Sequence, residues 1–175
     1  MTRLFDILFS GLGLLLGWPV LGVIALVGWF DSGSPLFKQV RVGRFQQPFT
    51  LVKFRTMRPG TASVATHLAN SNAITPFGRF LRRTKLDELP QLWNVFKGDM
   101  AFIGPRPERK YYIDQIIQHD PRYVYLYQLR PGVTSYATLY NGYTDTMEKM
   151  LKRLDLDKDE AGTARADAEE PRMAA

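Results

Sequence analysis

The first thirty residues separate from the rest of the chain by their pattern of apolar and polar positions. From Ile7 to Phe30 there are 24 consecutive residues without a formal charge, rich in leucine, valine and glycine. About 20 apolar residues in a helix are enough to cross the hydrocarbon core of a bilayer. A secretory signal peptide is the alternative, but the run is longer than an h-region and no small-residue cleavage site follows it. The pattern therefore predicts a membrane-inserted helix within residues 1–34.

Two features of this segment bear on how it meets the membrane. Pro19, at its centre, removes a backbone donor and clashes with the preceding turn, which favours a sharp bend. Arg3 precedes the segment, and no acidic residue lies between Asp31 and Asp87. Basic flanks prefer the cytoplasmic side of a membrane. If both ends lie on that side, the segment is a re-entrant helical hairpin; a straight or kinked spanning helix is the alternative.

Residues 35–156 combine strand-like and helix-like patterns, which predicts one compact α+β domain that is mostly helical. Two strand-like runs flank turn material at residues 43–48 and predict a hairpin. A long loop of low charge is expected over residues 59–76. The strands are predicted at Leu36–Val42 and Phe49–Met57, and the helices at Phe77–Arg83, Asp87–Lys97, Pro107–His119 and Thr144–Leu154, with a short apolar run at Met100–Gly104.

The charge of the chain is unevenly distributed. The formal charge is +6, but residues 155–175 hold seven acidic against three basic residues, so residues 1–154 have a charge of +10. A field of that sign suits an anionic partner such as nucleic acid, phospholipid headgroups or a phosphorylated small molecule. Residues 157–175 have almost no large apolar side chain and are predicted to form a polar disordered tail.

Candidate chemistry has to use oxygen or nitrogen groups, because the chain has no cysteine. Asp87 and Glu88 are adjacent, and like charges repel unless cations or a metal offset them. Pro90 is tolerated in the first turn of a helix, so we expect Asp87 at or near a helix N-cap. Capping explains one carboxylate but not two. Neighbouring side chains on a helix diverge by about 100°, which suggests two different roles.

One role is that of a nucleophile and the other is that of a metal ligand. Arg82, Arg83, Lys85 and the helix N-terminus should lower the pKa of an aspartate nucleophile at position 87. A single carboxylate together with substrate phosphates is the usual way in which proteins hold Mg²⁺. The metal would also screen the repulsion between the nucleophile and an anionic phosphate.

Further cations are placed where they could bind phosphate. Arg106 lies between two prolines, which fix the backbone and present the guanidinium with little entropy left to lose. A plain turn is the alternative interpretation of that segment. Lys53 and Arg55 alternate along the second predicted strand, so they should share one face and meet phosphate or lipid headgroup charge.

These residues together resemble the bacterial small monotopic phosphoglycosyl transferases, the polyprenyl-phosphate hexose-1-phosphate transferase group. The resemblance covers roughly Arg3–Leu156 and rests on long blocks in the right order. The blocks are QVRVG at 39–43, KFRTM at 53–57, GRFLRRTKLDELPQLWNVFKGDM at 78–100, IGPRPE at 103–108 and RPGVT at 130–134.

The resemblance implies a re-entrant membrane helix and a catalytic domain on the cytosolic face of the bacterial inner membrane. It implies transfer of a sugar 1-phosphate from a UDP-sugar donor to polyprenyl (undecaprenyl) phosphate, with release of UMP, as the first membrane step of glycoconjugate synthesis. Asp87 would form a covalent aspartyl-phosphosugar intermediate, and Glu88 would hold Mg²⁺. Membrane phospholipid is an expected partner and nucleic acid is not. The expected substrate-binding residues are Lys53, Arg55, Arg82, Arg83 and Arg106.

A second hypothesis comes from another functional class. The chain could be a non-catalytic, membrane-anchored module that binds anionic lipid or nucleic acid through its basic face. The two hypotheses differ in what they require of Asp87, which is essential only to the enzyme.

Overall fold

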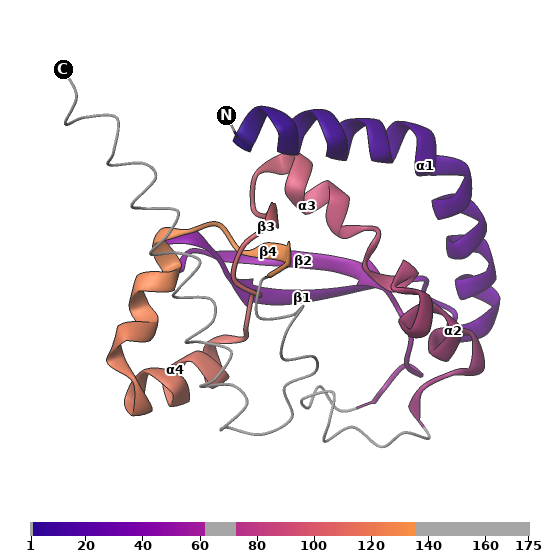
Figure 1. The fold of residues 1–175 in the computed structure, drawn as a ribbon. Helices are drawn as coiled ribbons and strands as arrows, with labels where there is room; N and C mark the ends of the chain where they lie inside the picture. Colours follow the sequence, from indigo (N-terminus) through magenta and orange to yellow (C-terminus); the bar gives the residue numbers. More distant parts are fainter. Residues whose placement is uncertain (1, 62–72, 136–175) are drawn as a thin grey trace. The chain divides into compact units, whose positions relative to one another are not determined.

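The computed structural model describes residues 2–61 and 73–135 (Figure 1). The chain divides into two compact units. Unit 1 comprises residues 1–40 and 50–98, and unit 2 comprises residues 41–49 and 99–175. The expected mixture of helices and strands is confirmed. The predicted helix Thr144–Leu154 and the predicted tail at 157–175 lie outside the described residues, and the predicted domain boundaries stay predictions.

The apolar N-terminal segment forms one helix, α1 (Thr2–Ser32), with Pro19 inside it. Figure 1 shows that α1 bends near its middle, as expected where a proline removes a hydrogen bond of the helix. The helix is long and apolar enough to cross a membrane by length and composition. Most of its large apolar side chains are exposed, which is unlike a core helix of a soluble protein. It could therefore anchor the chain in a membrane.

Both ends of α1 are bound by hydrogen bonds to other parts of unit 1. Near the N-terminus, the guanidinium of Arg3 donates hydrogen bonds to the carbonyl oxygens of Val95 (2.6 Å) and Phe96 (2.8 Å). After the C-terminus, Arg55 Nε donates to the carbonyl oxygen of Ser34 (3.0 Å). Between these ends, Ile24 is buried in a cluster with other apolar side chains of the same unit. The members of this cluster are Ile24, Phe54 and Leu81, with Leu21, Ala25, Phe77, Leu86 and Leu89 packed against it.

The predicted hairpin is present as strands β1 (Leu36–Val42) and β2 (Pro48–Phe54), which pair in a two-stranded sheet. Their connection includes a short 3₁₀ helix, η1 (Arg44–Gln46), and is too short for a parallel crossover. The prediction that the second strand extends to Met57 is wrong. The chain leaves the sheet after Phe54 because β1 begins only at Leu36, and Met57 instead forms an isolated bridge with Ile74.

The helix α2 (Pro76–Thr84) confirms the prediction, with one more residue at each end. Thr75 caps it, because its hydroxyl accepts a hydrogen bond from the backbone N–H of Gly78 (2.9 Å). The helix ends at Lys85, which adopts the left-handed conformation (φ 60°).

The prediction of one helix over Asp87–Lys97 is wrong. The segment divides into a short 3₁₀ helix, η3 (Leu86–Glu88), and α3 (Gln91–Lys97). Pro90 lies directly before α3 and has no N–H with which to continue a helix from η3. The helix α3 ends at Lys97, as predicted, and Gly98 after it adopts the left-handed conformation (φ 101°). The acidic pair therefore lies in a tight turn between α2 and α3.

Unit 2 contains a parallel pair of short strands, β3 (Ala101–Ile103) and β4 (Gly132–Thr134). In this pair Ala101 lies opposite Gly132, and Ile103 lies opposite Thr134. Between them lie α4 (Lys110–His119) and the 3₁₀ helix η4 (Pro121–Gln128). The predicted start of α4 at Pro107 is wrong, because the backbone before Lys110 is extended and pairs with β1. The core residues of this unit are Val42, Ile113, Ile116, Tyr123 and Leu126.

Candidate active site

Asp87 occupies the middle of η3 in unit 1, and it is buried, with 6% of its surface exposed. Within the part of the chain that the structure describes, its Oδ1 atom is buried without a hydrogen-bond partner. A buried carboxylate oxygen without a partner is rare in folded proteins, since its desolvation is not compensated. Such a group is typical of a site that acts on, or is completed by, a ligand.

The pKa of Asp87 is raised above its ordinary value, mainly by burial and then by the neighbouring charge of Glu88. The cations that oppose this rise are Lys53, Arg82 and Lys85. Arg82 and Lys85 act in the predicted direction, but the prediction that the pKa is lowered overall, with help from a helix N-terminus, is wrong. Asp87 does not cap an α-helix, and removal from water outweighs the attraction of the three cations.

The two adjacent carboxylates fit part of a magnesium site. Glu88 is half-buried and follows Asp87 in the same turn. No group of three or more histidine or acidic side chains suited to a metal ion occurs among residues 2–61 and 73–135. The acidic pair alone cannot fill the octahedral shell of Mg²⁺, but carboxylates together with substrate phosphate oxygens commonly do. The unpartnered oxygen of Asp87 and its repulsion with Glu88 are what a cation would relieve.

Two of the cations that were predicted to bind substrate lie close enough to affect Asp87. Lys53 is on β2, and Arg82 is on α2, where its Nε donates to the hydroxyl of Thr56 (2.8 Å). Arg82 is thereby held in place by a side chain of the segment after β2. The structure thus brings Lys53, Arg82, Asp87 and Glu88 together from three elements of unit 1.

The predicted shared face of Lys53 and Arg55 is confirmed, because both cations lie over the ring of Phe37, at 5.7 and 5.6 Å from its centroid. Arg55 also donates hydrogen bonds to the carbonyl oxygens of Ser34 and Leu36. These hydrogen bonds hold the backbone that joins α1 to β1, so they serve the fold. Arg83 is exposed on α2. The substrate-binding roles of Arg55 and Arg83 stay predictions.

Asn94 contributes to the site but was not predicted from the sequence. It is buried on α3, and its side chain accepts from the N–H of Val52 (3.1 Å) and donates to the carbonyl oxygen of Thr50 (2.8 Å). These bonds fix β2, and with it Lys53, against the helix that follows the acidic pair. A polar residue among the apolar positions of a short helix was the only sequence signal.

Arg106 belongs to unit 2, where it lines a small pocket with its two neighbouring prolines. The backbone around it is held by Arg41, whose Nη1 donates to the carbonyl oxygen of Pro107 and to the carboxylate of Glu108, both at 3.2 Å. Burial lowers the pKa of Arg41, and the nearby charges of Arg106 and Arg109 lower it further. The guanidinium groups of Arg106 and Arg109 thus lie near that of Arg41, which is paired with Glu108, and a net positive cluster of this kind attracts anions.

We expect Arg41→Gln to destabilise unit 2 by about 2 kcal/mol, because it leaves the carboxylate of Glu108 partly buried without its cation. Both side chains of this ion pair are only 17% exposed. Chemical denaturation in detergent measures the change. The matched control is Lys110→Gln, which breaks the exposed ion pair with Asp114 and should have no measurable effect. Equal effects of the two substitutions would contradict the prediction.

Comparisons with known proteins identify relatives over most of the chain. The family model described as bacterial sugar transferase matches residues 1–163. The chain is 40% identical over 162 residues to the UDP-glucose:undecaprenyl-phosphate glucose-1-phosphate transferase of Escherichia coli (strain K12), covering 90% of this chain and 35% of that protein. The enzyme of the same name in Caulobacter vibrioides is 38% identical, with 90% of this chain and 61% of the relative covered.

The match covers a larger share of a shorter relative. The putative undecaprenyl-phosphate N-acetylgalactosaminyl 1-phosphate transferase of Bacillus subtilis (strain 168) is 38% identical, with 68% of each chain covered. By contrast, the chain spans only about a third of the length of the Escherichia coli relative. The similarity thus includes the acidic pair and the segments around it, but not the whole of the longer proteins.

Proposed function

The chain belongs to the bacterial sugar transferase family, and we propose that it transfers a sugar 1-phosphate from a UDP-sugar to undecaprenyl phosphate. The observation that carries this proposal is the buried carboxylate of Asp87, which has an unpartnered oxygen and lies beside Glu88, Lys53 and Arg82. The names of the relatives, which all specify undecaprenyl phosphate and in two of the three specify UDP-glucose, support the two substrates.

The proposed reaction proceeds in two displacements at one phosphorus atom. In the first, a carboxylate oxygen of Asp87 attacks the phosphorus that bears the sugar, the bond to the bridging oxygen breaks, and UMP leaves with that oxygen. In the second, a phosphate oxygen of the polyprenyl phosphate attacks the same phosphorus and the bond to Asp87 breaks. The products are polyprenyl diphosphate-sugar, UMP and the free carboxylate. Each displacement forms one phosphorus–oxygen bond and breaks one.

The side chains around Asp87 account for how an anionic nucleophile meets an anionic donor. Only the ionised form of Asp87 attacks, and its burial raises its free energy relative to a carboxylate in water. Lys53 and Arg82 supply fixed positive charge at the same place. Glu88 would hold Mg²⁺, which, when bound, neutralises charge on the diphosphate. These groups orient the donor and keep it from being repelled.

The remaining predicted contacts concern the donor. We propose that Arg106 binds a phosphate group of the nucleotide, because it belongs to a cluster of guanidinium groups and because Arg41 fixes the backbone next to it. Arg83 and Arg55 would add to the positive field that attracts the donor. No nucleic acid is needed as a partner in this scheme.

We also propose that α1 is re-entrant, with both ends on the cytosolic face of the bacterial inner membrane. The hydrogen bonds of Arg3 to α3 and of Arg55 to Ser34 support this topology, because both ends of α1 are tied to the same unit. A spanning helix would place its two ends on opposite sides of the bilayer and break one of these attachments. The bend in α1 and the basic flanks agree with a segment that enters and turns back.

The topology predicts the labelling of single cysteines, which the chain otherwise lacks. Thr2→Cys and Ser34→Cys, made separately, should both be shielded in intact spheroplasts from a thiol reagent that does not cross the membrane. Both should be labelled after permeabilisation, which is the control for reactivity. Labelling of Thr2→Cys alone in intact spheroplasts would establish a spanning helix.

The function is tested by incubating the full chain with a panel of UDP-sugars and Mg²⁺ in the absence of a lipid acceptor. We expect the intact mass to increase by one sugar phosphate, with release of one UMP for each modified chain, and peptide mapping should locate the adduct on Asp87. Undecaprenyl phosphate added afterwards should remove the adduct. Turnover of a UDP-sugar without any covalent species would contradict the proposed intermediate.

A further inference from the structure

Thr56, in the segment after β2, contacts α2 at both of its ends. It is buried, with 5% of its surface exposed. Its carbonyl oxygen accepts a hydrogen bond from the N–H of Thr75 (3.1 Å), the residue that caps α2. Its hydroxyl accepts a hydrogen bond from Nε of Arg82 (2.8 Å), in the last turn of the helix. Between these two bonds, Gly78 lies so close to the backbone of Thr56 that only a glycine fits there.

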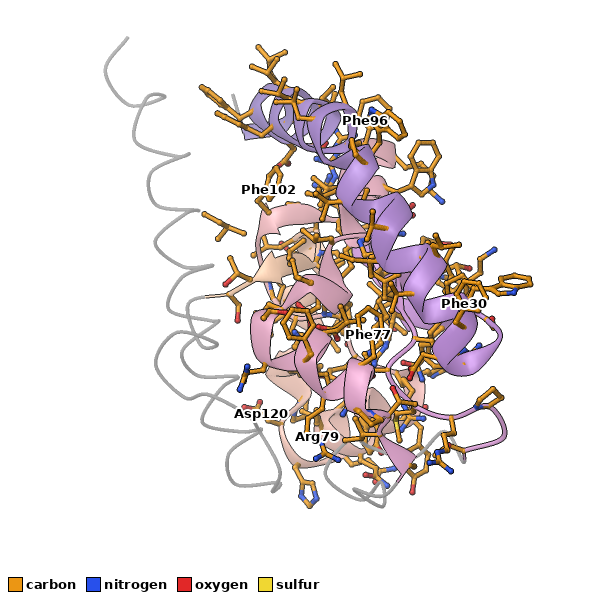
Figure 2. The ribbon with its side chains drawn as sticks, turned by 90° about the vertical axis from the view of Figure 1, so that its right-hand side faces the viewer. Phe30, Phe77, Arg79, Phe96, Phe102 and Asp120 are labelled. Atoms are coloured by element: carbon orange, nitrogen blue, oxygen red, sulfur yellow. The ribbon has the colours of Figure 1, made fainter. Side chains whose placement is uncertain are left out.

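These contacts fix the rotation of α2 about its axis. Gly78 and Arg82 are four residues apart, so they share the face of α2 that meets Thr56. Phe77 and Leu81 share another face, and both belong to the apolar cluster that joins α2 to α1. Figure 2 shows Phe77 beside α1. Because α2 is held on two faces, the hydroxyl of Thr56 decides the direction of the guanidinium at position 82.

The guanidinium of Arg82 keeps its two terminal groups available. Within the described parts of the chain, its side chain makes one hydrogen bond, from Nε to Thr56, and its two Nη groups have no partner. Arg82 lies close enough to Asp87 to oppose the rise in its pKa, yet these two described side chains form no ion pair. A guanidinium is planar and rigid, so fixing Nε also fixes the four N–H groups on Nη1 and Nη2. Such a fork matches two oxygens of a phosphoryl group.

We propose that Thr56 is a positioning residue, whose hydroxyl keeps the guanidinium of Arg82 from pairing with Asp87 and directs its two Nη groups at a phosphoryl group of the substrate. An ion pair between Arg82 and Asp87 would occupy both the nucleophile and the donors that bind phosphate. The inference deepens the proposed function and rests on it, because Asp87 is the nucleophile there. The phosphoryl group belongs to the UDP-sugar or to the polyprenyl phosphate, and its chemistry is the same in both.

Thr56→Val tests this role, because valine has nearly the shape of threonine but lacks the hydroxyl. We expect at least one of the two reaction steps to slow about tenfold or more at subsaturating substrate, since a misdirected guanidinium no longer orients the phosphoryl group. The unfolding midpoint in detergent should stay close to that of the wild type. If the valine variant does not fold, Thr56→Ala, which removes atoms without adding any, takes its place.

The two steps are measured separately with the full chain in detergent. Formation of the adduct from a UDP-sugar measures the donor step, and removal of a preformed adduct by undecaprenyl phosphate measures the acceptor step. A loss in the first step alone assigns the phosphoryl group to the donor, and a loss in the second step alone assigns it to the acceptor. A loss in both assigns it to the phosphoryl group that is transferred. A loss in neither step overturns the proposal.

Two further variants separate the hydroxyl from other effects of the substitution. Thr56→Ser keeps the hydroxyl and should restore most of the rate. A serine variant as slow as Thr56→Val would show that packing of the methyl group matters instead, which overturns the proposal. The matched control is Thr84→Val, at an exposed position of α2 where the hydroxyl donates to the carbonyl oxygen of Phe80 (2.9 Å). This control should react at the wild-type rate, and an equal loss in it would also contradict the role of Thr56.

A double-mutant cycle with Arg82→Lys shows whether Thr56 acts through the guanidinium. Lysine keeps the charge but has neither Nε–H nor a fork. The loss caused by Thr56→Val should therefore disappear in the Arg82→Lys background, whereas a merely structural role of Thr56 would give the same loss in both backgrounds. Additive losses would overturn the proposal.

Binding of inorganic pyrophosphate tests the positioning role independently of the proposed function. Isothermal titration calorimetry with the full chain compares the wild type, Thr56→Val and Arg82→Lys. We expect the two variants to weaken binding by similar factors, even if the wild type forms no adduct and the proposed function fails. Equal affinity of the wild type and Thr56→Val for pyrophosphate would overturn the role of Thr56 and leave the proposed function unaffected.

Discussion

Asp87→Asn should abolish the sugar-phosphate adduct and lower the rate of UMP release by at least about 10³-fold. The amide has nearly the shape of the carboxylate but has no anionic oxygen to attack phosphorus. Intact-mass measurement and a UMP-release assay with the full chain in detergent or vesicles check both effects. UMP release at the wild-type rate would show that another group is the nucleophile.

The same variant should fold at least as well as the wild type, which separates a chemical from a structural loss. The pKa of Asp87 is raised in the folded protein, so the buried anion destabilises the fold above that pKa, and this cost is relieved as the pH falls through it. A neutral asparagine removes the cost and the repulsion with Glu88. The unfolding midpoint of Asp87→Asn should therefore equal or exceed that of the wild type near neutral pH, and the difference should shrink on acidification.

Asp87→Asn also discriminates between the enzyme and the non-catalytic membrane module. We expect association with vesicles to depend on α1 and on exposed basic residues, and Asp87 is in neither group. The variant should therefore bind vesicles as the wild type does while its transferase activity is lost. Absence of UMP release from the wild type itself, together with equal lipid binding by both proteins, would favour the module.

Gly78→Ala should destabilise the chain by more than about 4 kcal/mol and give little folded protein. A Cβ at this position would lie 2.1 Å from the carbonyl oxygen of Thr56 and 2.6 Å from its carbonyl carbon. These are backbone atoms that cannot move without displacing α2 from the segment after β2. The hydrogen bond between Arg82 and Thr56 would be lost with them.

The matched control for this prediction is Gly22→Ala, which lies in α1 with nothing within 4 Å of the added Cβ. The yield of monodisperse protein and the thermal unfolding midpoint in detergent compare the two variants. Gly22→Ala should behave like the wild type. A Gly78→Ala protein that unfolds at the wild-type temperature would show that α2 and Thr56 can separate without cost.

The sequence was sufficient for the elements that depend on local patterns. The run from Ile7 to Phe30 specifies a long apolar helix, because it is long enough to span a bilayer as a helix and contains no charged side chain. Turn residues between two strand-like runs specify the hairpin, and Gly98 ends α3 because it adopts a backbone conformation that other residues disfavour. The acidic pair itself stands out in the sequence because two adjacent like charges need compensation.

The lengths of the strands and helices, and the burial and pKa of Asp87, depend on contacts with distant parts of the chain. The short second strand follows from where β1 begins, and the later start of α4 follows from the pairing of Glu108 with Val42 of β1. The pairing of β3 with β4 joins segments about thirty residues apart, and neither its parallel orientation nor β4 itself has a local signature.

By itself, then, the sequence determined that this chain has an apolar anchor, a hairpin and a paired carboxylate, because each of these is specified by neighbouring residues. Only the tertiary structure decided that Asp87 is buried with a raised pKa, that Arg3 binds carbonyl groups more than ninety residues away, and that Asn94 fixes the strand bearing Lys53. Burial and long-range hydrogen bonds arise when separate elements pack together, and the neighbours of a residue in the chain do not specify which elements those will be.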